Sequence, residues 1–305
     1  MIIVALVLLG LCFGSFVNAL VWRVHEQAKP KKPSVTPAKA GAQSVKERLR
    51  RTYLLGPAFR RGDASRLSIL HGRSMCPDCE HELAAKDLVP VLSWLSLKGK
   101  CRYCDKPISY QYPLVELVTA LLFVASYIWW PVPVHGSQVT LFVIWLPILI
   151  GLLALLVYDL RWMLLPNRIL YPAGALAGLY ALVNILIAQR PLTALLNIVL
   201  AVIVGGGIFY VLFQVSAGKW IGGGDVKLGW LLGLIVGTPA RSILFIFLAA
   251  LLGSAVSIPL LASHRLKRNS TIPFGPFLII AAIVVQLFGH AILLWYQRTF
   301  LPYSV

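Results

Sequence analysis

Residues 140–160 read TLFVIWLPILIGLLALLVYDL and carry one charged side chain, Asp159. A helix of about 20 apolar residues crosses the hydrocarbon core of a bilayer, so this stretch predicts a transmembrane helix. Comparable apolar runs occur at 1–22, 114–131, 169–188, 194–215, 226–238, 242–262 and 277–297. The sequence therefore predicts an all-α polytopic membrane protein with about eight transmembrane helices. The short run at 226–238 predicts a thinned bilayer, a tilted helix or a partly re-entrant one.

The composition and the position of the charges exclude several classes of protein. Of the 305 residues, 58% are hydrophobic and 13% are charged. A soluble enzyme needs more polar surface, and disordered or fibrous chains lack repeated apolar runs of this length. The net charge of +17 is concentrated in residues 23–112, which hold 18 Lys and Arg against 8 Asp and Glu. A basic loop of this kind is expected at the cytoplasmic side of a membrane, so the charge does not indicate nucleic-acid binding.

The chain divides into three regions. Residues 1–22 have basic residues after the apolar run and none before it, which predicts a retained first transmembrane helix with its N-terminus outside. Residues 23–112 form a cytoplasmic loop with a basic linker (29–66) and a compact domain (73–112). Residues 113–305 form the transmembrane core, whose short loops place seven basic residues inside and three outside.

Four of the five cysteines form two Cys-x-x-Cys pairs, Cys76 with Cys79 and Cys101 with Cys104. Each pair offers two thiolates from one tight turn, and two such turns complete the tetrahedral four-cysteine site of structural zinc. Two disulfides or four free thiols are the alternatives, but disulfides are rare on the cytoplasmic side of a membrane. The spacing therefore predicts a small cytoplasmic zinc-binding domain between the first and second helices.

The zinc ion is expected to compensate for a small apolar core. The apolar residues available for that core are Leu83, Leu88, Val89, Val91, Leu92, Trp94, Leu95 and Leu97. The fifth cysteine, Cys12, lies in the first helix and is expected to be a small buried hydrophobe.

Outside residues 23–112 the chain has three acids, Glu116, Asp159 and Asp225. Acids in or near lipid are costly, so each one is a hypothesis of function. Two helices separate Asp159 from Asp225, which returns the chain to the same membrane face and allows the two carboxylates to meet. Such a pair shares a proton, so one member activates water while the other polarises a carbonyl, which suits peptide hydrolysis.

A more ordinary interpretation of these acids is also open. Asp159 and Asp225 can instead be interfacial aspartates paired with Arg161 or Lys227. For Glu116 we expect a buried hydrogen-bonding partner near the start of the second helix, and binding of a charged substrate group is the alternative.

The chain resembles the bacterial prepilin peptidases, also called type IV leader peptidases, which are intramembrane aspartic proteases of the GxGD type. The blocks that carry the resemblance run nearly end to end, and they are Gly14-Ser15-Phe16-Val17-Asn18 with Arg23, Arg73-Ser74-Met75-Cys76-Pro77, Asp87 to Leu95, Gly99-Lys100-Cys101-Arg102, Tyr112 to Glu116, Asp159 to Asn167, Gly222-x-Gly224-Asp225-Val226-Lys227 and Ile272-Pro273-Phe274-Gly275-Pro276.

The resemblance implies a multi-pass protein of the bacterial inner membrane whose large loop and active site face the cytoplasm. It implies cleavage of prepilins and type II secretion pseudopilins just after a glycine, with Asp159 and Asp225 as the catalytic residues. It also implies methylation of the new N-terminus from S-adenosylmethionine and associates Gly14 and Arg23 with that step. Helix packing for Gly14 and a snorkelling anchor for Arg23 are the alternatives. The partners implied are these substrates and the lipid bilayer, with no nucleic acid and an open oligomeric state.

Two departures from the family pattern stand out. Asn167 occupies the last place of a motif that usually ends in Asp, and the basic linker is longer than usual. We expect cleavage to survive, because Asp159 at the start of that motif is the catalytic residue. Two other functions remain open. A proton-coupled transporter would place its acids near mid-membrane, and a zinc-domain scaffold for a secretion or pilus machine would not need either aspartate.

Overall fold

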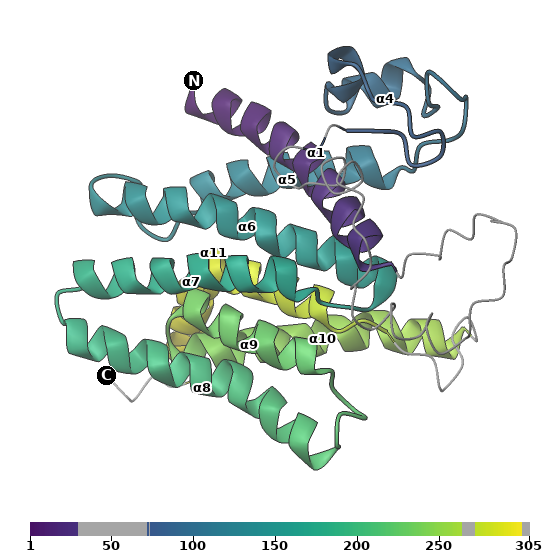
Figure 1. Cartoon of the computed structure of the whole chain (residues 1–305). Coiled ribbons are helices and arrows are strands. Elements are labelled where there is room, and N and C mark those ends of the chain that lie inside the picture. Colours follow the sequence, from purple (N-terminus) through teal and green to yellow (C-terminus); the bar gives the residue numbers. More distant parts are fainter. Residues whose placement is uncertain (30–71, 73, 264–271, 301–305) are drawn as a thin grey trace, which may run out of the picture.

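The structure is a computed structural model that describes residues 1–29, 72, 74–263 and 272–300. Nearly all of the expected basic linker (29–66) and the basic loop at 264–268 lie outside the described residues. Eight helices form the membrane region (Figure 1), and they are α1 (Ile2–Ala28), α5 (Gln111–Ile128), α6 (Ser137–Trp162), α7 (Asn167–Ile187), α8 (Pro191–Val215), α9 (Gly223–Val236), α10 (Pro239–Ala262) and α11 (Gly275–Phe300).

Seven of these helices are long and apolar enough to cross a membrane. The exception is α9, whose 14 residues rise only about 21 Å against a hydrocarbon core of about 30 Å. The described residues contain no β-strand, so the all-α polytopic fold is confirmed. The short run expected at 226–238 corresponds to the helix that does not reach across.

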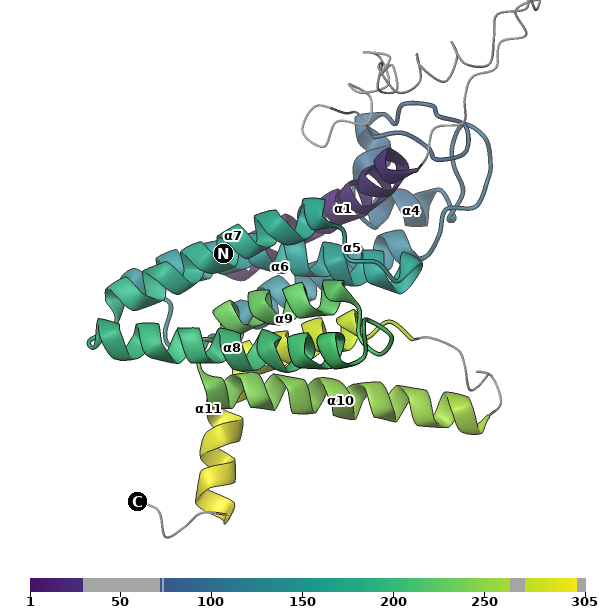
Figure 2. The same ribbon diagram turned by 60° about the horizontal axis from the view of Figure 1, so that its bottom comes forward.

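Helix α6 lies at the centre of the bundle, with Trp145, Ile148, Leu149 and Leu152 fully buried. Helix α11 packs against both α6 and α9, and its C-terminal end projects beyond the other helices (Figure 2). The start of α11 is therefore held between the helices that carry Asp159 and Asp225.

Helices α1 and α5 make close backbone contact through glycines. A Cβ atom at Gly10 would lie 2.4 Å from Ala120 Cα, and one at Gly14 would lie 2.5 Å from Glu116 Cα. Small residues at such a spacing allow two membrane helices to approach closely. The expectation that Cys12 is buried in the same helix is wrong, because its side chain is exposed on the outside of the bundle.

The small domain lies between α1 and α5 in the chain and contains the short helices η1 (Ala85–Leu88) and α4 (Leu92–Ser96). Figure 1 shows it beyond the starting end of α5 and to one side of α1. The apolar core expected for it is wrong, because none of the eight proposed core residues is buried. Leu92 and Leu95 are 65% and 58% exposed. This domain therefore depends on polar contacts, on its cysteine cluster and on packing against α1 and α5.

Candidate active site and metal site

Asp159 and Asp225 come from helix ends that lie at the same end of the bundle. Asp159 is in the last turn of α6, where Met163 adopts a left-handed conformation (φ 52°) and donates its N–H to the Asp159 carbonyl at 2.8 Å. Asp225 is in the first turn of α9, directly after three glycines. Neither acid is in mid-helix, which argues against a proton relay through the membrane centre.

Gly275 marks the place where the two carboxylates meet. A Cβ atom built on Gly275 would lie 2.5 Å from Asp159 Oδ2 and 3.7 Å from Asp225 Oδ1. The Gly275 backbone N–H also donates a hydrogen bond to the Asp159 carboxylate. Because the first residue of α11 is Gly275, no side chain fills this position, and both acids face the same small space.

The segments that carry the two acids are fastened to each other by two further contacts. A Cβ atom at Gly224 would lie 3.1 Å from Leu165 Cβ, so these residues are already in contact. Lys227 Nζ donates a hydrogen bond to Asn167 Oδ1 at 3.0 Å. Asn167, the residue at which the sequence departs from the pattern of the resemblance, thus accepts a hydrogen bond from Lys227.

The alternative that each aspartate is an interfacial anchor paired with a base finds no support in the described residues. No ion pair there includes Asp159 or Asp225. Lys227, one of the two bases considered as partners, is bonded to Asn167 instead. Asp159 is buried, with 5% of its surface exposed. Two adjacent carboxylates without a counter-ion favour sharing of one proton.

The four cysteines of the predicted zinc site converge. The sulfur atoms of Cys76, Cys79, Cys101 and Cys104 all lie within 4.8 Å of one another, and those of Cys76 and Cys104 are 3.9 Å apart. A tetrahedral zinc ion with bonds of about 2.3 Å places its sulfur ligands about 3.8 Å apart. The chemistry and the spacing of this donor set fit a structural zinc ion.

The two Cys-x-x-Cys turns are built alike. In the first, Cys76 N donates to His81 O at 3.0 Å, and in the second, Cys101 N donates to Lys106 O at 2.9 Å. The residue after each second cysteine, Glu80 or Asp105, has φ of 56°. This repeat gives two matching knuckles that present their thiols to one point. None of the four cysteines forms a disulfide.

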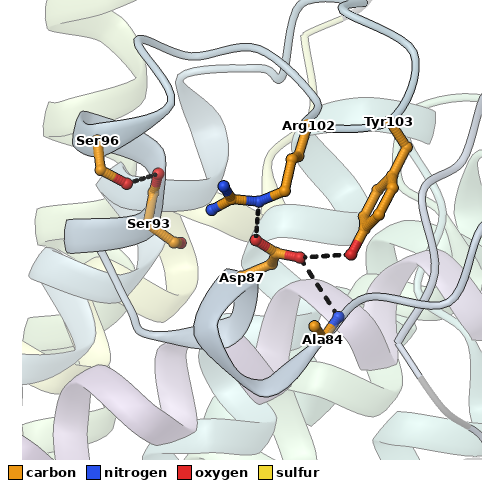
Figure 3. Close-up of polar contacts among 6 residues, drawn as sticks. All are labelled: Ala84, Asp87, Ser93, Ser96, Arg102 and Tyr103. Atoms are coloured by element: carbon orange, nitrogen blue, oxygen red, sulfur yellow. Dashed lines mark hydrogen bonds and ion pairs between the residues drawn. The ribbon is translucent and has the colours of Figure 1, made fainter.

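Asp87 joins the helical part of the small domain to the second knuckle (Figure 3). Its carboxylate accepts hydrogen bonds from Arg102 Nε at 2.8 Å, Tyr103 Oη at 3.0 Å and Ala84 N at 3.3 Å. Burial raises the pKa of Asp87, but the hydrogen bonds from Arg102 and Tyr103 outweigh this effect and hold the pKa below its ordinary value. The acid is therefore ionised at neutral pH.

A cavity of about 330 Å³ lies between the small domain and the ends of α1, α5 and α6 that carry Arg23, Tyr112 and Arg161. Its walls combine aromatic rings with acids and bases, among them Trp22, Arg23, Asp87, Tyr103, Glu116 and Arg161. Ligand pockets of this size hold a small molecule whose orientation is fixed by a few polar groups. The cysteine domain thus covers a mainly apolar cavity with a few charged groups at the end of the membrane helices.

Glu116 is 6% exposed and accepts a hydrogen bond from Val91 N at 2.7 Å. Val91 has φ of 60°, a strained conformation for a β-branched residue, so this bond holds a strained turn of the small domain against α5. Glu116 is therefore a buried hydrogen-bonding partner, as expected from the sequence.

Gly14 and Arg23, which the resemblance associates with methyl transfer, lie in different places. Arg23 lines the cavity and donates from Nη2 to Gly72 O at 2.7 Å. Gly14 does not line it, and its contact with α5 matches the alternative of helix packing. Both assignments remain predictions.

Two residues of the sites were not assigned a role from the sequence. Gly275 was quoted within the last block of the resemblance, and only the folded structure shows its contact with both acids. Asp87 was quoted within a block of the resemblance, and its partners Arg102 and Tyr103 lie 15 and 16 residues further along the chain. No local pattern links these partners. The signal in the sequence was that Asp87 and Arg102, which carry opposite charges, both stand in the quoted blocks.

Comparison with known proteins identifies the family of the chain. Residues 8–130 match the profile of the bacterial peptidase A24 N-terminal domain, and residues 146–258 match that of the type IV leader peptidase family. No solved structure matches the chain.

Several relatives named prepilin leader peptidase/N-methyltransferase match most of the chain. The protein from Aeromonas salmonicida is 33% identical over 295 residues, which are 96% of this chain and 93% of the relative. The protein from Pseudomonas aeruginosa is 30% identical over 98% of this chain and 93% of the relative. The protein from Bacillus subtilis is 34% identical over 76% of this chain and 88% of the relative. With two paired acids, a cysteine cluster and similarity along nearly the whole length, the chain belongs to the type IV leader peptidase family.

Proposed function

We propose that this protein cleaves the leader peptides of type IV prepilins and type II secretion pseudopilins and then methylates the new N-terminus. The relatives named prepilin leader peptidase/N-methyltransferase support both activities. The observation that carries the cleavage step is the approach of Asp159 and Asp225 to one point beside Gly275.

The two acids supply acid–base catalysis of peptide hydrolysis. The ionised member of the pair removes a proton from water, while the protonated member donates a hydrogen bond to the scissile carbonyl. The Gly275 N–H orients the Asp159 carboxylate. The absence of a side chain at Gly275 leaves room for the substrate backbone, which must pass within hydrogen-bonding distance of both acids.

We place the acids and the cysteine domain at the cytoplasmic side of a bacterial inner membrane. The distribution of charge supports this orientation, because the loop at 23–112 carries most of the basic residues of the chain. A zinc ion bound by the four cysteines would hold the two knuckles together, since the domain buries none of its expected apolar core.

The cavity beneath the cysteine domain is our proposed site for S-adenosylmethionine, which supplies the methyl group. Arg23 and Arg161 provide charge for a carboxylate, Glu116 provides charge for an amine, and Trp22 and Tyr103 provide flat surfaces for a heterocycle or a sulfonium. We propose that Gly14 acts through packing, since it sets the position of Glu116 on α5.

The two reactions use different faces of α6. Asp159 and Arg161 are two residues apart, which turns their side chains about 200° from each other around the helix. Asp159 contacts the start of α11, whereas Arg161 lines the cavity. We therefore expect each reaction to be removable by mutation without loss of the other.

The test follows both reactions with the full-length protein in lipid, a prepilin and labelled S-adenosylmethionine. Asp159→Asn should abolish cleavage of the prepilin but keep methylation of a pilin that has already been cut. Asp105→Asn is a matched control, because Asp105 is exposed and has a positive φ that Asn tolerates. Cleavage at a near-normal rate by the Asp159 variant would refute the proposed dyad. No cleavage by the unmodified protein would favour a scaffold.

A further inference from the structure

We propose that a second polar cavity, at the end of the membrane core opposite to Asp159 and Asp225, binds a phospholipid head group that carries a hydrogen-bond donor. The cavity has a volume of about 250 Å³ and lies among α7, α8, α9, α10 and α11. Its polar walls are formed by Tyr180, Asn184, Asn197, Thr238, Arg241 and Gln286. The proposed proteolytic and methyl-transfer sites use none of these residues.

Arg241 brings a positive charge into this cavity without a side-chain counter-ion. Its side chain is half-buried, and in the described part of the chain no ion pair includes it. Outside residues 23–112 the sequence has only three acids, and all of them lie at the opposite end of the bundle. An uncompensated charge in the membrane region is costly, so a bound anion is the expected partner of this guanidinium group.

Gln286 adds an unfulfilled hydrogen-bond acceptor to the cavity wall. Its side chain is 4% exposed, and its Nε2 donates to Tyr180 Oη at 2.7 Å. Its Oε1 is the single buried side-chain oxygen or nitrogen without a partner among the described residues. A buried acceptor without a donor is unfavourable, so a ligand that brings a hydroxyl or ammonium group would relieve it.

The short helix α9 explains why this cavity is open to head groups. Helix α9 ends at Val236, and the turn at Gly237 and Thr238 lines the cavity. With a rise of about 21 Å, α9 leaves this turn within the thickness of the bilayer. Irregular backbone at that depth is tolerated where it is covered by protein or lines a polar cavity. The recess therefore provides a polar space just below the membrane surface.

The walls of the cavity select the class of ligand. Arg241 suits a phosphodiester, Thr238 and Asn197 can donate to its oxygens, and Gln286 requires a donor on the same head group. Leu195 and Leu196 beside Asn197 are exposed on the outside of the bundle, where acyl chains lie. Phosphatidylglycerol and phosphatidylethanolamine carry both the phosphate and a donor. Phosphatidylcholine carries the phosphate but has no donor.

The experiment measures lipid binding to the full-length protein in detergent by native mass spectrometry. The probes are phosphatidylglycerol, phosphatidylethanolamine, phosphatidylcholine and inorganic phosphate. We expect the first two to bind about tenfold more tightly than phosphatidylcholine, and inorganic phosphate to bind more weakly still. Arg241→Gln should weaken binding of all three lipids about tenfold, whereas Arg190→Gln, an exposed arginine at the same end of the bundle, should not.

Gln286→Leu tests the acceptor separately. It should remove the preference for head groups with donors while keeping the phosphate contact to Arg241. Prepilin cleavage serves as the check that each variant is folded, because neither residue lies at the proposed dyad. Equal binding of all three lipids by the unmodified protein, or unchanged binding by Arg241→Gln, would overturn the proposal. Inorganic phosphate that binds as tightly as the lipids would also overturn it, because the site would then recognise an anion without recognising lipid.

Discussion

Replacement of Gly275 by alanine tests whether the start of α11 positions the proposed catalytic carboxylates, Asp159 and Asp225. The new Cβ atom would lie 2.5 Å from Asp159 Oδ2, whereas contacts of at least 3.4 Å are ordinary. Helix α11 has little freedom to retreat, because Leu278 and Ile279 are fully buried one turn later. The Asp159 carboxylate must therefore move by nearly 1 Å.

A displacement of about 1 Å at a catalytic group lowers a rate about 100-fold, which corresponds to about 2.7 kcal/mol of activation free energy. We expect this loss in kcat for prepilin cleavage, measured on gels with the purified protein in lipid. Methylation of a pilin that has already been cut should remain, since its proposed cavity is on the other face of α6.

Gly178→Ala is the matched control, because a Cβ atom at Gly178 in α7 would meet nothing within 4 Å. This variant should keep both activities. A kcat for Gly275→Ala within threefold of the unmodified protein would refute the argument from contact distance. Equal loss of cleavage and of methylation would instead indicate a folding defect.

Three further predictions concern the cysteine domain and the loop after Asp159. Cys101→Ser should lower zinc retention against a chelator at least about tenfold, measured by elemental analysis, and unchanged zinc would refute the ligand assignment. Asp87→Asn should destabilise the domain by about 1.5–3 kcal/mol at pH 7, measured by limited proteolysis. Because folding lowers the pKa of Asp87, the stabilisation by its carboxylate is lost as the pH falls below about 4. A difference in stability between Asp87→Asn and the unmodified protein that persists at lower pH would contradict this prediction. Asn167→Asp should change cleavage less than about threefold, because an exposed pair with Lys227 contributes little, and a larger loss would show that the amide is required.

The apolar runs of the sequence predicted the membrane helices well, because a bilayer imposes the length and composition of each span. The position of each residue around its helix was harder to predict. Cys12 was expected inside the bundle but faces outward, because lipid tails and a helical interface are equally apolar. Sequence hydrophobicity alone therefore does not distinguish the two environments.

The cysteine pairs predicted a metal site because the geometry of each Cys-x-x-Cys turn is local. The surrounding domain was harder to predict, since its stability depends on contacts that are distant in the sequence. Leu92 and Leu95 were expected to form a core but are exposed. Instead, Glu116 on the membrane helix α5 accepts a hydrogen bond from the backbone N–H of Val91 and so anchors the domain. In the same way, Gly275 approaches Asp159 only after the last helix has packed into the bundle.

The placement of the cavity and the acids on opposite faces of α6 constrains the shape of the substrate. If the two reactions use the proposed sites, the new chain end moves after the cut from one face of α6 to the other, a path at least as long as the helix diameter of about 10 Å. An extended chain covers this distance with about three residues, whereas a helix needs about seven. On the proposed assignment of the two sites, we expect the first residues of the mature pilin to be unwound when the methyl group is added. A substrate whose helix begins at its first residue would be cut but left without the methyl group.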